Sequence, residues 1–426
     1  MGMKNKIALF LVTVTILLSQ SLWADAEDRR QAKRIHDRLT GVPATNAIID
    51  DMEDLLEGTS VNGYAGDVNG KTAAQYAIDT AQNPNARYFY NVTLKNFAAP
   101  WTNEEQTVFT ALNDYSATVV GLIRDQGDFR QILHGDIIYR GATNLGINSY
   151  STSDNNHYEQ LEALGPVTGD LANPNILQGT ITTPSVSQSA VTGLASSATA
   201  GVMTSRAGAM AFFSDGTNRA MFRFTMMNHL CTDLEPLKDV SRTPDRIRQD
   251  VSRSPGGDSR IFLNSCIGCH AGMDGMAGAF AYYEWDYTND KTDGNLVFTD
   301  GVVSGKHLIN PNNFAPGNIM SDDSWVNYWR NGQNWLLGWG TAVDPDPKGN
   351  ETGNGAKSLG QELANSDAFA QCQVDKVFES VCLRSPSEFY AQDRTVRDNI
   401  VTAFKTTYNY NLREVFTDVA AHCKGD

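Results

Sequence analysis

The chain has 426 residues and a formal net charge of −15 at pH 7, from 49 acidic and 34 basic side chains. An acidic surface disfavours binding to nucleic acid or to anionic lipid, so we expect neither as a partner. A chain of this length can bury a large core, and at the usual ~100–200 residues per domain it has room for two or three modules. Its oligomeric state does not follow from the sequence.

The N-terminus has the three parts of a secretory signal peptide. Lys4 and Lys6 supply a positive start, residues 7–18 form the apolar run IALFLVTVTILL, and residues 24–26 (Ala-Asp-Ala) fit a cleavage site. Cleavage after the first of these alanines fits nearly as well as cleavage after the second. An uncleaved anchor is the alternative, but the run is shorter than the ~20 residues that span a bilayer. We therefore expect a periplasmic or extracellular protein with no membrane span after signal cleavage.

Helical periodicity dominates the first part of the remaining chain. Apolar residues recur at helical spacing through residues 27–58, with Thr45 or Asn46 as a candidate N-cap and Gly58 as a stop signal. Residues 103–123 and 127–140 are expected to form two further helices. These segments predict an N-terminal helical module.

Composition changes near Gly141. Residues 141–200 are rich in Ser, Thr, Asn and Gly, and predict an irregular segment. Helices are expected again in MTSRAGAMAFF and in NRAMFRFTMMNHLC, the latter ending at Cys231. Residues 286–355 carry few helix signals. The end of the chain predicts helices at 358–382 and 386–407 and a last one that ends near His422.

One motif carries chemistry: Cys266-Ile267-Gly268-Cys269-His270, a CxxCH sequence. Two thiols three positions apart on a helical turn can reach both vinyl groups along one haem edge, and the following histidine can reach the iron. A zinc half-site is an alternative, but no second CxxC or HxxxH completes it. A thioredoxin-like pair is another, but no βαβ pattern surrounds it. We expect one covalent haem c, bound through Cys266 and Cys269, with His270 as the proximal iron ligand. Asp258 and Ser259 are both candidate N-caps of the helix that carries the motif, and we expect Asp258.

The sixth iron ligand is left open by the sequence. Met320 lies in NNFAPGNIMSDDSW, an irregular Pro/Gly/Asn-rich loop that suits an axial methionine, and we name it as the possible distal ligand. His307 is the rival and would give bis-histidine ligation, while His229 on an upstream helix is a third candidate. Met273 and Met276 follow His270 too closely to cross the haem, and we expect them to pack beside it. An open sixth position would instead favour ligand binding or peroxide chemistry.

Four further cysteines remain in an exported chain, which predicts up to two disulfides with three possible pairings. If residues 368–382 form one helix, Cys372 and Cys382 lie about 15 Å apart at ~1.5 Å per residue. A disulfide needs Cα atoms within about 7 Å of each other. We therefore expect no bond between Cys372 and Cys382, and leave the partners among Cys231, Cys372, Cys382 and Cys423 open.

The order of these features resembles the large exported cytochrome-like proteins of planctomycete type, which are built from several helical modules around one CxxCH. The resemblance covers most of the mature chain, and only the CxxCH within it is a specific motif; Gly275 stands where such proteins often have proline after Met-Asp. It implies a mainly helical fold and a haem on Cys266, Cys269 and His270, and no particular substrate. The segments that carry it are 34–56, 112–139, 205–213, 228–231, 266–286 and 359–381.

The predicted fold class is mainly α: a multi-module helical protein with a cytochrome c-like haem region and long irregular loops. The predicted function is that of an exported c-type cytochrome that transfers electrons to or from a redox partner protein. The main alternative is a haem-dependent oxidoreductase or peroxidase with an open or labile sixth iron site, so enzyme activity is left undecided. A third possibility is a structural or binding module in which the haem mainly stabilises the fold. The predicted parts are a signal peptide (1–26), an N-terminal helical module (27–140), an irregular segment (141–200), a haem-binding module (201–350) and a C-terminal helical module (351–426).

Overall fold

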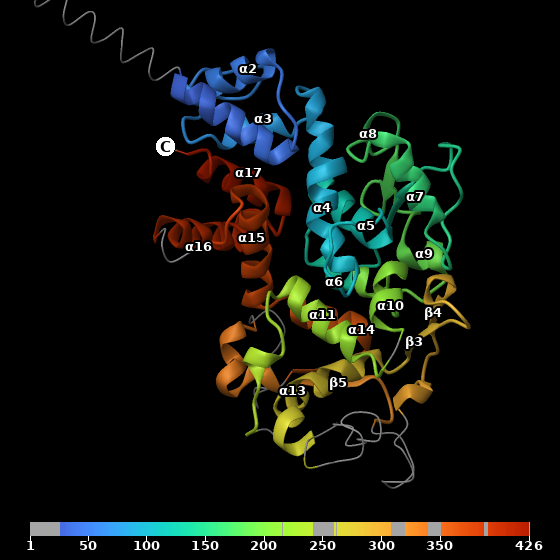
Figure 1. The fold of residues 1–426 in the computed structure, drawn as a ribbon. Coiled ribbons are helices and arrows are strands. Elements are labelled where there is room, and N and C mark those ends of the chain that lie inside the picture. The colour runs from blue at the N-terminus through green and yellow to red at the C-terminus, as the bar shows by residue number, and fades with distance from the viewer. Residues whose placement is uncertain are drawn as a thin grey trace, which may run out of the picture. The chain divides into compact units, whose positions relative to one another are not determined.

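The structure is a computed structural model that describes residues 26–214, 216–241, 260, 262–307, 320–339, 351–386 and 391–425. Residues 1–25 of the predicted signal peptide and the expected cap Asp258 lie outside the described residues. Helices dominate the described residues, whose strands form three short antiparallel pairs, so the predicted mainly α class is confirmed (Figure 1). The strand pairs are β1 with β2, β3 with β4, and β5 with β6.

The chain divides into two compact units. The first combines the described part of Met1–Thr93 with Val377–Val396 and Arg413–Asp426, and the second combines Leu94–Lys376 with Arg397–Leu412. The units interleave along the sequence, whereas the predicted modules follow one another. The module boundaries themselves stay predictions.

The first unit packs N-terminal helices with the end of the chain. Helix 26–40 is followed by α2 (Asn46–Leu56), in which Thr45 caps the N-terminus by accepting from the backbone N–H of Ile48, and by α3 (Lys71–Ala77). The apolar side of α2 is buried, as its periodicity predicted. The ring of Phe89 meets that of Phe416 edge to face, which places α17 (Leu412–His422) in the core of this unit.

The second unit is built around α5 (Asp114–Arg124), which is buried along its whole length. The predicted helix 103–123 is wrong over residues 103–113. There the amide of Asn103 donates to the carbonyl oxygen of Thr107 (3.1 Å) and accepts from its N–H (3.0 Å), so local side-chain bonds replace the helical ones. Asn113 then begins α5 with a capping box. The predicted helix 127–140 reduces to α6 (Gln131–His134), since Gly135 ends it and the chain continues into β1 (Tyr139–Gly141).

The Ser/Thr/Gly-rich segment 141–200 contains short regular elements. Strand β1 pairs with β2 (Leu177–Gly179), and three short helices lie in this part of the chain. Arg124 donates from Nη1 to the carbonyl oxygens of Leu171 and Leu177, which anchors the segment to α5. The segment is thus irregular but packed. Its helices are α7 (Asn156–Ala163), α8 (Gly165–Thr168) and α9 (Gln188–Thr192).

The C-terminal helices largely match their predictions. The expected helix 358–382 is split at Asn365 and Ser366 into α14 (Gly355–Ala364) and α15 (Asp367–Cys382). Helix α16 (Ala391–Thr406) and α17 follow. The two helices expected in MTSRAGAMAFF and NRAMFRFTMMNHLC are also confirmed, as α10 (Arg206–Phe212) and α11 (Arg219–His229).

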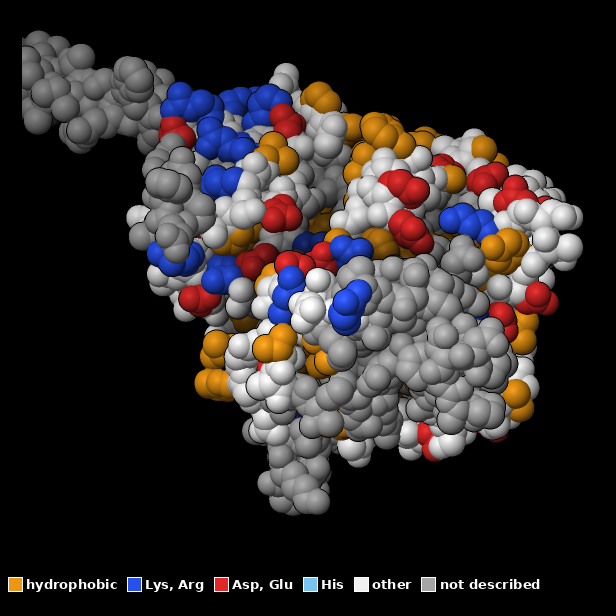
Figure 2. Space-filling view, turned by 60° about the horizontal axis from the view of Figure 1, so that its bottom comes forward, with side chains coloured by type: hydrophobic (Ala, Val, Ile, Leu, Met, Phe, Trp, Pro, Cys, Tyr) orange, Lys and Arg blue, Asp and Glu red, His pale blue; other side chains and the backbone are white. Residues whose placement is uncertain are grey.

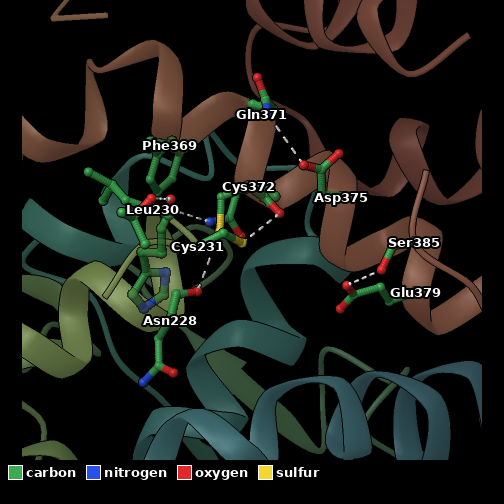
Figure 3. Close-up of a disulfide and its surroundings, with 12 residues drawn as sticks. Asn228, Leu230, Cys231, Phe369, Gln371, Cys372, Asp375, Glu379 and Ser385 are labelled. Carbon is green, nitrogen blue, oxygen red and sulfur yellow. Dashed lines mark hydrogen bonds between the residues drawn. A yellow bond between two sulfur atoms is a disulfide. The ribbon is translucent and has the colours of Figure 1, made fainter. Parts of the chain in front are cut away.

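Two disulfides join cysteines of the described chain. Cys231 bonds to Cys372 within the second unit, and Cys382 bonds to Cys423 within the first. Figure 3 shows the first of these between the end of α11 and α15, close to Leu230 and Phe369. Cys372 and Cys382 do not pair with each other, as their separation on one helix predicted.

Removing the Cys382–Cys423 bond should destabilise the first unit. The bond closes a loop of 41 residues, and a loop of that size lowers the entropy of the unfolded chain by an amount worth roughly 2–4 kcal/mol. We expect the double variant Cys382→Ala plus Cys423→Ala to lose about that much free energy of unfolding in urea, without reductant. A loss below about 1 kcal/mol would contradict this role.

Basic side chains gather where the described chain begins (Figure 2). Helix 26–40 carries five of them, and several are neutralised by carboxylates: Arg29 pairs with Asp50 (2.5 Å) and Glu53 (2.6 Å), and Lys33 pairs with Asp37. No helix among the described residues is both long and apolar enough to cross a membrane.

Candidate functional site

The CxxCH motif lies at the start of α13 (Ile267–Ala277), directly after a π-helical turn, η6 (Phe262–Cys266). Cys266 and Cys269 are both reduced and partly exposed, whereas the other four cysteines are in disulfides. Their spacing of three residues places both thiols on one side of the helical turn. The two thiols are therefore available together on one surface.

The local environment of Cys269 does not favour a reactive thiolate. Its Sγ contacts the carbonyl oxygen of Leu234 at 3.6 Å. Burial raises the pKa of the Cys269 thiol, although Lys238 acts in the opposite direction. Redox-active CxxC pairs have lowered thiol pKa values. Cys269 therefore lacks the lowered thiol pKa of such pairs.

His270 is held by a carboxylate one turn further along α13. Its Nδ1 lies 3.1 Å from Oδ2 of Asp274, whose side chain is 3 % exposed. Arg219 of α11 donates to both oxygens of the same carboxylate, at 2.7 and 2.6 Å. Burial raises the pKa of Asp274, but Arg219 and the hydrogen bond from His270 outweigh it, and the net shift is downward. Asp274 is thus ionised at neutral pH.

Helix α13 is packed tightly on its other sides. A Cβ at Gly272 would lie 2.0 Å from Nε1 of Trp329, so only glycine permits this approach of helix and indole. Helix α13 also contacts α11 and β5 (Ser324–Asn327), and these elements lie together in Figure 1. Met273 and Met276 are buried in this packing. The position of the motif is therefore fixed by α11, β5 and the tryptophan.

A pocket with about 210 Å³ of empty space, open solvent included, adjoins Asp274 of α13. Both predicted distal ligands, Met320 and His307, line it. His307 is buried, and Met320 is partly exposed. Its other lining residues are Thr217, Arg219, Ala277 and Gly278.

The third candidate ligand, His229, is packed in an aromatic cluster. Its Nε2 is 2.7 Å from the hydroxyl of Tyr115, and its ring lies among those of Trp101, Tyr115 and Phe369. Burial lowers the pKa of His229 to about 3. This histidine is a neutral part of the aromatic core beside the Cys231–Cys372 disulfide.

The residues at the motif fit covalent haem attachment. Two reduced thiols stand beside a histidine whose Nδ1 is hydrogen-bonded to a carboxylate, an orientation in which Nε2 would be the nitrogen that binds iron. Across the described ranges, no group of three or more His, Cys, Asp and Glu side chains is arranged to hold a metal ion by itself.

Sequence reasoning missed Asp274 and Arg219. Asp274 follows His270 by four positions, which is the spacing of neighbours on a helix, so its contact with the imidazole could have been inferred. Arg219 lies 55 positions from Asp274 in the sequence, and nothing local indicates their pairing.

Comparisons with known proteins identify no relative: no family model, no curated protein and no solved structure matches the chain.

Proposed function

We propose that this chain is an exported c-type cytochrome that carries one covalent haem and transfers electrons to or from a redox partner protein. The observation that carries the proposal is the arrangement at the start of α13. There Cys266 and Cys269 are reduced and partly exposed, next to a histidine oriented by Asp274. A haem bound there would supply one-electron chemistry at its iron.

Each residue of the motif has a distinct role in the proposal. The thiols of Cys266 and Cys269 would each add across one vinyl group of a haem, forming a thioether with no leaving group. His270 supplies Nε2 as the proximal ligand. Met320, in its Pro/Gly/Asn-rich sequence context, is proposed as the distal ligand, and His307 as its rival.

Two further observations support export. The N-terminal sequence has the pattern of a signal peptide. The described residues also contain two disulfides, which persist in oxidising compartments such as the periplasm or the cell exterior. The resemblance to exported planctomycete-type cytochromes, read from the order of sequence segments, agrees with both.

A reduced-minus-oxidised spectrum with and without carbon monoxide tests the coordination. With Met320 as the ligand, the wild-type oxidised protein has a sulfur-to-iron charge-transfer band, and the reduced protein binds carbon monoxide slowly. Met320→Ala should abolish the band and speed binding at least tenfold, while the matched variant His307→Ala keeps both properties.

If His307 is the ligand, the wild-type oxidised protein lacks the sulfur-to-iron band, and His307→Ala, not Met320→Ala, speeds carbon monoxide binding. Rapid binding of carbon monoxide by the wild-type protein would contradict a closed site and favour the haem-dependent oxidoreductase or peroxidase. Absence of any haem spectrum in the exported protein would contradict the proposed function as a whole.

A further inference from the structure

The partner of His270 is a buried, ionised carboxylate. Oδ2 of Asp274 accepts from Nδ1 of His270 at 3.1 Å and from Nη2 of Arg219 at 2.6 Å, while Oδ1 accepts from Nε of Arg219 at 2.7 Å. Asp274 is 3 % exposed and Arg219 is 27 % exposed, so the carboxylate is shielded from water more than its cationic partner. The three side chains form one hydrogen-bonded network that joins α11 to α13.

We propose that Asp274 is a positioning residue that orients His270 and lowers the reduction potential of the haem iron, and that Arg219 limits this effect. The inference rests on the proposed function and deepens it. Two residues outside the CxxCH motif would thus set the reduction potential of the haem that the motif binds.

The physical reason lies in what the carboxylate does to the imidazole. By accepting a hydrogen bond from Nδ1–H, Asp274 favours the tautomer of His270 in which Nε2 carries the lone pair. The same hydrogen bond fixes the orientation of the imidazole ring. A hydrogen bond to an anion also makes Nε2 a stronger electron donor. A stronger donor and a nearby negative charge stabilise ferric iron more than ferrous iron, and burial increases this effect because the local dielectric constant is low. The reduction potential is therefore lowered.

Arg219 acts in the opposite direction. Its guanidinium spreads the carboxylate charge over a bidentate pair and so weakens the pull of Asp274 on the Nδ1 proton. The two residues are in direct contact, yet their removal should shift the potential in opposite directions. A purely structural role would not produce this pattern, because loss of either partner would disturb the same contact in the same way.

The test is a redox titration of the haem absorption in four variants and the wild type. We expect Asp274→Asn to raise the potential and Arg219→Gln to lower it. Each change should alter the ferric-to-ferrous ratio at a fixed potential at least tenfold, which for one electron is about 59 mV. Asp274→Glu keeps a carboxylate and should lie between the wild type and Asp274→Asn.

Asp375→Asn is the matched control, since Asp375 belongs to another Arg–Asp pair, with Arg397 on α16. Its potential should equal that of the wild type. Haem staining after denaturing electrophoresis is measured first on every protein. Staining together with unchanged potentials in Asp274→Asn and Arg219→Gln, or with shifts of the same sign, overturns the inference and leaves the proposed function intact. Absence of staining in the wild type overturns the proposed function, and the inference with it.

Discussion

The double variant Cys266→Ser plus Cys269→Ser is expected to fold, to be exported and to carry no covalent haem. Both thiols are partly exposed and reduced, and neither forms a disulfide, so serine at both positions removes little packing. A hydroxyl does not form the thioether, and His270 alone would hold a haem only by a coordinate bond. Denaturing electrophoresis followed by haem staining measures the loss directly, with complete absence of the stained band as the expected result.

The matched control for this experiment is Cys382→Ala plus Cys423→Ala. That variant also removes two cysteines, but from a disulfide in the first unit. It should keep the stained band, even though its stability falls. A band that persists in the Cys266/Cys269 variant would show that the haem is attached elsewhere or that the band is not a covalent haem.

Substitution at a buried ion pair in the second unit, which contains α13, is expected to lower the free energy of unfolding strongly. Arg330 donates to both oxygens of Glu362 at 2.8 and 2.7 Å, with side chains 6 % and 1 % exposed. Asn327 adds a third hydrogen bond to the same carboxylate. Arg330→Met leaves Glu362 buried without its counter-charge, and we expect a loss of roughly 3–5 kcal/mol in the free energy of unfolding.

A double variant distinguishes the energetic cost of an uncompensated charge from the cost of lost packing. Arg330→Met plus Glu362→Leu removes both charges together, and buried pairs replaced in this way often cost little. We expect it to be more stable than Arg330→Met alone by at least 2 kcal/mol in the same urea titration. If the double variant were the less stable of the two, the cost would come from lost packing and not from an uncompensated charge.

The sequence was informative where the signal is local. Helical periodicity depends on neighbours three and four positions apart. It predicted the helix in NRAMFRFTMMNHLC, which is confirmed, and a helix over 358–382, which forms as two helices split at Asn365 and Ser366. The CxxCH motif is also local. Because Cys372 and Cys382 lie on one helix, the sequence excluded their pairing, and the disulfides agree.

The errors and omissions come from contacts that the sequence pattern does not encode. Residues 103–113 have helix-forming composition, but the amide of Asn103 bonds the backbone of its own loop. The choice between the remaining two disulfide pairings depended on which helices meet. The bonds of Asp274 with Arg219, and of Arg330 with Glu362, likewise join residues 55 and 32 positions apart.

The most direct test of the central proposal is the intact mass of the exported wild-type protein under denaturing conditions. The protein is produced in a host that attaches c-type haem outside the cytoplasm and is then treated with a thiol-alkylating reagent without reductant. We predict a chain heavier by one haem, with no alkylated cysteine, since Cys266 and Cys269 are thioethers and the other four are disulfides. A chain without added haem, alkylated at both Cys266 and Cys269, would contradict the proposal.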